Sequence, residues 1–181
     1  MENFNAPKHH YFYAVGLSYK KADAEIRGQF SLDTKAKTKV LEQAKKKGIE
    51  SLIVTSTCNR TEIYGFAQHP FQLIKLLCEN SQGTVEDFQK VAFVYKNNEA
   101  ISHMFRVGTG LDSQILGDFE IISQLKNAFV QSKELNLANA FLERLVNAVI
   151  QASKKIKTDT QISSGATSVS FASVQDIFKN V

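Results

Sequence analysis

The chain has 181 residues, of which 43% are hydrophobic and 22% charged, a composition typical of a folded globular protein rather than a disordered or fibrous one. Its apolar runs all fall short of the roughly 18 to 20 residues of a membrane span, and the N-terminus lacks a signal-peptide apolar stretch, so we expect a cytoplasmic protein without membrane contact. Two cysteines exclude a disulfide framework, and a net charge of +4 is compatible with an RNA partner without requiring one.

The first half of the chain predicts an α+β unit. Strands are expected from alternating or continuous apolar residues at 11–18, 52–55, 62–67 and 91–95. Asp33 is placed to cap a helix that ends before Gly48, Pro70 to open another, and a short helical turn is expected at 86–89. The resulting order is the split βαββαβ arrangement of ferredoxin-like domains, with helices covering an antiparallel sheet.

The second half predicts helices only. We expect Asn98 to cap the first of them, and long apolar stripes at helical spacing predict two more at 119–134 and 138–157. Serines around Gly165 predict a loop, followed by a short amphipathic segment at 168–179. The boundary between the two halves is expected at 96–98.

The chemistry of the chain is concentrated around Cys58. The sequence Ser-Thr-Cys-Asn-Arg-Thr-Glu at 56–62 follows a short apolar strand, so the cysteine is expected at the point where a strand ends. Polar groups are costly to bury without partners, which argues for a use of this cluster. A cation such as Arg60 and the amides of a turn favour the thiolate, so we predict that Cys58 is a nucleophile. Cys78, among leucines on a helix, is interpreted as a packing residue.

A second polar cluster extends from His103 to Gln124. His103 and Arg106 are one helical turn apart and can face the same way. Glycines then interrupt the helix, and between them lies a dense polar loop containing Asp112, Ser113, Asp118 and Glu120.

Together these segments resemble glutamyl-tRNA reductase. The resemblance rests on the cysteine motif, on His-x-x-Arg-Val-x-x-Gly-Leu-Asp-Ser-x-x-Leu-Gly about 45 residues later, and on Thr-Gln-Ile-Ser-Ser-Gly-Ala at 160–166. It implies the first step of tetrapyrrole (porphyrin) biosynthesis, an oxidoreductase reaction. The cysteine attacks the ester of glutamyl-tRNA, NADPH reduces the resulting thioester, and glutamate-1-semialdehyde leaves. A covalent intermediate divides one difficult step into two easier ones.

The resemblance also implies roles for single residues. Cys58 would be the nucleophile and His103 a second catalytic residue. Arg60 would be a bidentate partner for a substrate carboxylate. The implied substrate-binding residues are Thr57, Cys58, Asn59, Arg60, Ser113, Asp118, Phe119, Glu120 and Gln124. The family commonly has Gly-Glu-Pro-Gln where this chain has Gly-Asp-Phe-Glu at 117–120, so an acid replaces an amide at Glu120.

The resemblance further implies a division of the chain and a set of partners. Residues 1–97 would be the ferredoxin-like part of a catalytic domain, 98–158 its helical part, and 159–181 a linker toward an NADPH-binding domain. The chain reaches Val181 without a Gly-x-Gly-x-x-Gly motif after a strand. We therefore expect a fragment limited to thioester formation or glutamyl-tRNA hydrolysis. The implied partners are glutamyl-tRNA, a second copy of the full-length protein and the aminomutase that takes the semialdehyde.

Two other functions fit parts of the sequence. Ferredoxin-like topology and the Tyr-Gly-Phe-Ala run at 64–67 are also found in RNA-recognition modules, which have no need of Cys58. A Cys–His hydrolase using Cys58 and His103 would hydrolyse generic esters or amides, and its activity would not depend on tRNA. A metal site is not expected, because no cysteine pair has ligand spacing, His9 and His10 are adjacent at the N-terminus, and His69 is isolated.

Overall fold

A computed structural model describes residues 10–160 and contains one antiparallel sheet. Its strands are β1 (Tyr11–Ser18), β2 (Leu52–Ser56), β3 (Arg60–Ala67) and β4 (Phe93–Lys96). They lie in the order β2-β3-β1-β4, and each neighbouring pair is antiparallel. This is the predicted split arrangement, in which a helical segment follows β1 and another follows β3. The expected segment at 168–179 and nearly all of the expected linker lie outside the described residues.

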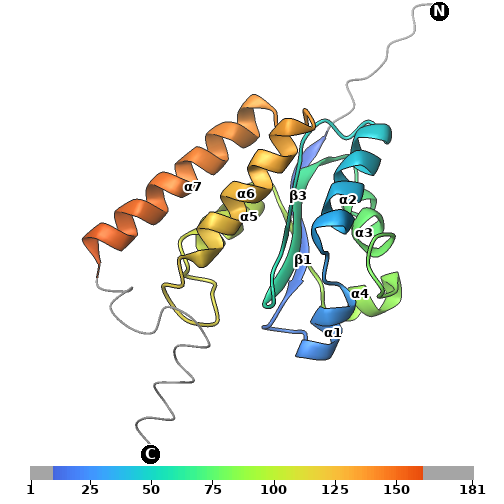
Figure 1. The fold of residues 1–181 in the computed structure, drawn as a ribbon, viewed down its shortest axis with the longest axis horizontal. Coiled ribbons are helices and arrows are strands. Elements are labelled where there is room, and N and C mark those ends of the chain that lie inside the picture. The colour runs from blue at the N-terminus through green and yellow to red at the C-terminus, as the bar shows by residue number, and fades with distance from the viewer. Residues whose placement is uncertain (1–9, 161–181) are drawn as a thin grey trace, which may run out of the picture.

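Helices cover both faces of the sheet, which gives three layers (Figure 1). One face carries α1 (Ala24–Gln29), α2 (Thr34–Lys46), α3 (Phe71–Cys78) and α4 (Val85–Val91). The other carries α5 (Asn98–Gly108), α6 (Glu120–Glu134) and α7 (Ala140–Asp159). Each face of the sheet has its own hydrophobic core, the first under α1–α4 and the second under α5–α7. Side chains of β1 alternate between them: Tyr13 and Val15 belong to the first core, and Phe12 and Ala14 to the second.

Capping side chains set the start of several helices. The Asp33 carboxylate accepts a hydrogen bond from the Ala36 amide at 2.8 Å, which confirms the predicted start of α2. Helix α1 was not predicted. Asp23 caps it, but none of its residues is buried, so it leaves no apolar stripe in the sequence.

Several predicted boundaries are wrong by one or two residues; the fourth strand, for example, begins at Phe93 and not at residue 91, which belongs to α4. Two of the corrections affect the layer that holds the site. Asn97, not Asn98, precedes α5, and its side chain accepts a hydrogen bond from the Phe12 amide of β1 instead of capping the helix. Strand β3 begins at Arg60 rather than at residue 62. Because side chains alternate along a strand, Arg60, Glu62 and Tyr64 therefore share the face covered by α5–α7.

The helices described between residues 10 and 160 include none that is both long and apolar enough to cross a lipid bilayer.

Candidate active site

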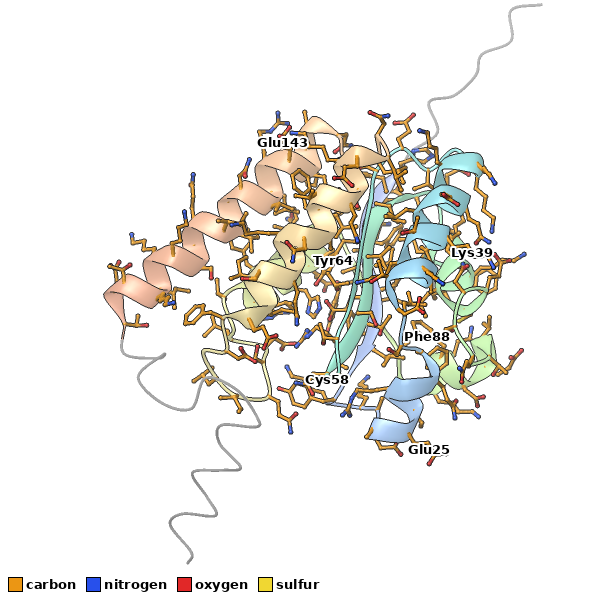
Figure 2. The ribbon with its side chains drawn as sticks, in the orientation of Figure 1. Glu25, Lys39, Cys58, Tyr64, Phe88 and Glu143 are labelled. Carbon is orange, nitrogen blue, oxygen red and sulfur yellow. The ribbon has the colours of Figure 1, made fainter. Side chains whose placement is uncertain are left out.

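Cys58 lies in the tight turn that joins β2 to β3 (Figure 2). The Thr57 amide donates to the Arg60 carbonyl at 2.8 Å, and the Thr57 hydroxyl accepts from the amides of Asn59 and Arg60, each at 3.2 Å. From α1, the Arg27 Nε donates to the Cys58 carbonyl at 2.9 Å. The turn is therefore held in place by bonds to the Thr57 hydroxyl and to the Cys58 carbonyl, while the Cys58 side chain is exposed. This is a suitable placement for a nucleophile.

A cavity of about 100 Å³ lies beside this turn. It is formed by the turn, by the loop after α5 and by the first two turns of α6. Its lining residues are Thr57, Cys58, Asn59, Arg60, Ser113, Asp118, Glu120, Ile121 and Gln124. Segments more than 50 residues apart in the chain thus come together, and they include every predicted substrate contact except Phe119.

The loop between α5 and α6 is folded tightly enough to require glycine. Gly110 and Gly117 both have positive φ, at 75° and 80°, and the Gly117 amide donates to the Gly110 carbonyl at 3.1 Å. A Cβ at Gly110 would lie 3.1 Å from the Asp118 carbonyl oxygen, in addition to the backbone strain. This closed loop directs Ser113 and Asp118 toward the turn that carries Cys58.

Behind the cavity, the Arg60 guanidinium is held in a buried ion cluster. Its Nη1 donates to Glu62 at 2.8 Å, and both Nη1 and Nη2 lie 3.3 Å from Oδ2 of Asp112. Nη2 also donates to the Asp112 carbonyl, and Lys20 pairs with the same carboxylate from outside. Both terminal nitrogens of Arg60 are thus bonded within the protein. The bidentate bond of Arg60 to a substrate carboxylate therefore stays a prediction, and it would require one of these bonds to open.

Glu62 connects Arg60 to two aromatic residues. It is fully buried, and its second oxygen accepts a hydrogen bond from the Tyr64 hydroxyl at 2.5 Å. Burial alone raises the pKa of a carboxyl, but the Arg60 charge and the bonds from His103 and Tyr64 outweigh it and hold the pKa of Glu62 at about 2. Burial and the adjacent Glu62 charge raise the pKa of Tyr64 well above its usual value. Glu62 is therefore a permanent anion at neutral pH.

Two predicted site residues lie outside the Cys58 cavity. His103 is 3% exposed, its Nε2 lies 3.1 Å from Glu62, and its ring packs between those of Tyr64, Phe93 and Tyr95. With Arg106 it lines a separate cavity of about 320 Å³. Phe119 lines a groove between α6 and α7.

Cys78, interpreted as a packing residue, lies in the first core. It is 9% exposed, and burial together with the Glu86 charge raises its thiol pKa to about 11. Of the two cysteines, Cys58 is therefore the one available for chemistry.

Sequence reasoning missed Arg27 and the partners of Arg60. Arg27 belongs to the helix that was not predicted. For Glu62, alternation along a strand that starts at Arg60 would have placed both residues on one face. Ile121, the apolar member of the cavity, was assigned only to the buried stripe of its helix. Across residues 10–160, no group of three or more His, Cys, Asp or Glu side chains is placed to hold a metal ion.

Comparison with known proteins gives one consistent family. The profile described as "Glutamyl-tRNAGlu reductase, N-terminal domain" matches residues 15–160. The chain is 80% identical over 181 residues to glutamyl-tRNA reductase of Flavobacterium psychrophilum, and 72% identical to that of Christiangramia forsetii. In both cases the match covers all of this chain.

A solved structure agrees with the sequence comparisons. Glutamyl-tRNA reductase from Methanopyrus kandleri superimposes with a TM-score of 0.72 at 26% identity, covering 91% of this chain and 38% of that one. The chain spans 44% of the length of the Flavobacterium psychrophilum protein and 43% of that from Christiangramia forsetii. The fold, the Cys58 turn and these matches together show that the chain belongs to the glutamyl-tRNA reductase family, in the region of its N-terminal domain.

Proposed function

We propose that this chain carries out the acyl-transfer half of glutamyl-tRNA reduction, with Cys58 as the nucleophile. The observation that carries the proposal is the exposed thiol at the mouth of a small polar cavity, on a turn fixed by Thr57 and Arg27. The Cys58 thiolate attacks the glutamyl ester carbon and a C–S bond forms. The C–O bond to the terminal ribose breaks, and the ribose oxygen leaves with a proton as a hydroxyl. The product is a glutamyl thioester on Cys58 and free tRNA.

The cavity has the size and polarity for the glutamyl group. Asp118 and Glu120 supply two carboxylates, which suit the α-ammonium group of the substrate. Asn59, Ser113 and Gln124 supply uncharged donors and acceptors for its side-chain carboxylate. Binding of that carboxylate to Arg60 would require a bond to Asp112 to open. The acid at Glu120, unusual for the family, would therefore serve the ammonium rather than the carboxylate.

His103 would act as a positioning residue. It is separated from Cys58 by Glu62 and Arg60, and its bond to Glu62 fixes the carboxylate that holds the guanidinium. In this role it supports the wall of the cavity without touching the ester.

Reduction of the thioester would complete the family reaction, with NADPH as the reductant of the whole protein and glutamate-1-semialdehyde as product. Residues 10–160 do not fit a dinucleotide: their sheet is antiparallel, and no glycine-rich turn links a strand to a following helix there. The chemistry assigned to these residues therefore ends at the thioester. In the whole protein, residues 1–97 and 98–158 would form one catalytic domain, and residues 159–181 the linker that follows it. The whole protein would also form a homodimer and bind the aminomutase that takes the semialdehyde.

The proposal is tested by mixing the chain with tRNA that carries labelled glutamate, without reductant, and quenching in acid. We expect a protein-bound label that hydroxylamine releases, absent in Cys58→Ser and retained in Cys78→Ser. A Cys–His hydrolase would also turn over simple esters that lack RNA, and an RNA-binding module would bind tRNA equally well with and without Cys58. Label that persists in folded Cys58→Ser would refute the assignment.

A further inference from the structure

A second recessed surface lies beside the active site, between α6 and α7. The two helices run antiparallel on the outer layer (Figure 1), and a groove of about 210 Å³ separates their facing sides. Its apolar floor is formed by Phe119, Ile122 and Ile150, and its rim by Lys126, Lys154 and Lys157. We call this surface the lysine groove.

The rim of the lysine groove is a concentrated and unneutralised positive charge. Lys126, Lys154 and Lys157 are all exposed, and none of the three forms an ion pair with another residue in the range 10–160. Lys154 and Lys157 are one helical turn apart, so their Cβ atoms are about 5–6 Å from each other. Lys126 faces them from α6. Charges arranged along both sides of a groove suit an extended anion better than a single small ion.

Two further features point to a ligand in the groove. The Lys157 ammonium lies 5.7 Å from the centre of the Phe119 ring, so one face of that ring is already beside a cation. Ser153 is 3% exposed and lines the groove, which places a hydroxyl among the lysines of its rim.

The lysine groove adjoins the Cys58 cavity. Phe119 belongs to the groove, while its neighbours Asp118 and Glu120 line the cavity. The two sites carry opposite charges. The acidic residues of the cavity repel phosphate, whereas the lysines on the rim of the groove attract it. A substrate with a small amino acid at one end and a phosphate chain at the other would be oriented by this pattern.

We propose that the lysine groove binds the sugar–phosphate backbone of the RNA that carries the glutamyl group. This rests on the proposed function, which supplies an ester linked to RNA. Phosphate oxygens would pair with the lysine ammonium groups, and the Ser153 hydroxyl would donate a hydrogen bond to one of the phosphate oxygens. Contacts of this kind position a nucleic acid without reading its sequence. The groove would thus contribute to affinity and orientation, and Cys58 to the reaction.

The test compares two triple variants with equal loss of charge. In the first, Lys126, Lys154 and Lys157 are replaced by Gln. In the second, the matched control, Lys35→Gln, Lys39→Gln and Lys46→Gln remove exposed lysines of α2, which lies on the other face of the sheet (Figure 1). Binding of deacylated tRNA is measured at several salt concentrations, and Cys58 acylation is measured with glutamyl-tRNA and with a small glutamyl thioester that lacks RNA.

We expect the groove variant to bind deacylated tRNA at least about tenfold more weakly, with a slope of log K against log salt that is less negative by about 2. Its acylation by glutamyl-tRNA should need correspondingly more substrate and reach the same maximal rate, and its acylation by the small thioester should be unchanged. The α2 variant should resemble wild type. Because the binding measurement uses deacylated tRNA, it remains decisive even if no Cys58 adduct forms with either donor.

Two results would overturn the proposal. The first is wild-type tRNA affinity in the groove variant, and the second is an equal loss of affinity in the α2 variant. In the first case, a changed rate of proteolysis within residues 161–181 would identify the groove as a docking place for the chain's own segment.

Discussion

At the scale of single residues, the two cysteines are chemically unlike. Cys58 is exposed on its turn, whereas Cys78 is buried and its pKa is raised to about 11 by burial and by Glu86. The thiolate is the reactive form, so iodoacetamide at pH 8 should modify Cys58 and leave Cys78 intact in the folded protein. Peptide mapping after a timed quench measures this. Equal modification of both residues under native conditions would contradict the contrast.

Glu62 is the residue whose charge links stability to pH. Its pKa is about 2 in the folded protein against an ordinary 4.5, so its contribution is present above pH 4.5 and is lost as the pH falls toward 2. The shift corresponds to about 3 kcal/mol. Urea unfolding of wild type at pH 7 and pH 3 should show about 2 kcal/mol of this loss, because Glu62 is still mostly ionised in the folded protein at pH 3.

The matched variant Glu62→Gln removes the titrating group while it keeps the side-chain volume. We expect it to be less stable than wild type at pH 7 by about 3 kcal/mol, because Arg60 loses one of its two carboxylates in a buried site. Its stability should also change less between pH 7 and pH 3. An unchanged pH dependence in Glu62→Gln would show that other carboxyls dominate acid unfolding.

At the scale of elements, Gly16 in β1 lies where the neighbouring strand leaves no room for a side chain, beside the ion cluster. It pairs with Glu62 of β3, and a Cβ there would lie 2.5 Å from the Thr61 carbonyl oxygen and 2.8 Å from the Glu62 Cγ. Gly16→Ala should therefore destabilise the fold by about 1–3 kcal/mol and slow Cys58 acylation, because Glu62 has to move.

Gly28→Ala in α1 is the control for this substitution. A Cβ at Gly28 meets no atom within 4 Å, so alanine should stabilise the helix by about 0.5–1 kcal/mol through its better helix propensity. Thermal or urea unfolding of the two variants gives the comparison. Two variants of equal stability would contradict the packing argument at Gly16.

The sequence predicted elements better than it predicted the contacts between them. The first strand was predicted with its observed bounds, and Asp33 caps its helix as expected, because these features depend on neighbouring residues. The pairing of Arg60 with Asp112 spans 52 residues, and periodicity carries no information about such distances. That is why Arg60 was assigned to the substrate alone and why the burial of His103 against Glu62 was not foreseen.

At the scale of the whole molecule, the sheet is the shared support of two cores. Phe12, Ile53 and Tyr64 are buried by α5–α7 and not by the helices of the first half. Residues 1–97 produced alone would expose this apolar face to water, and we expect them to aggregate or to unfold without a cooperative transition. Circular dichroism and analytical ultracentrifugation of residues 1–97 test this. A monomer with cooperative unfolding would mean that the first half is an independent domain.

The arrangement of the two cores also explains where the site lies. The Cys58 turn is supported by α1 on one side and faces the loop and helix of the second half on the other. Both halves of the chain are therefore needed to form the cavity, and we expect neither half alone to be acylated on Cys58.

The role of Cys58 is tested most directly by locating the glutamyl group on the unmodified chain. Protein mixed with glutamyl-tRNA in the absence of reductant is quenched in acid, digested, and its peptides are examined by mass spectrometry. We expect one glutamyl group per chain, on the peptide that contains Cys58, and none on the peptide that contains Cys78. A glutamyl group on any other residue, or tRNA discharged with no acylated Cys58 at any time point, would contradict the role proposed for Cys58.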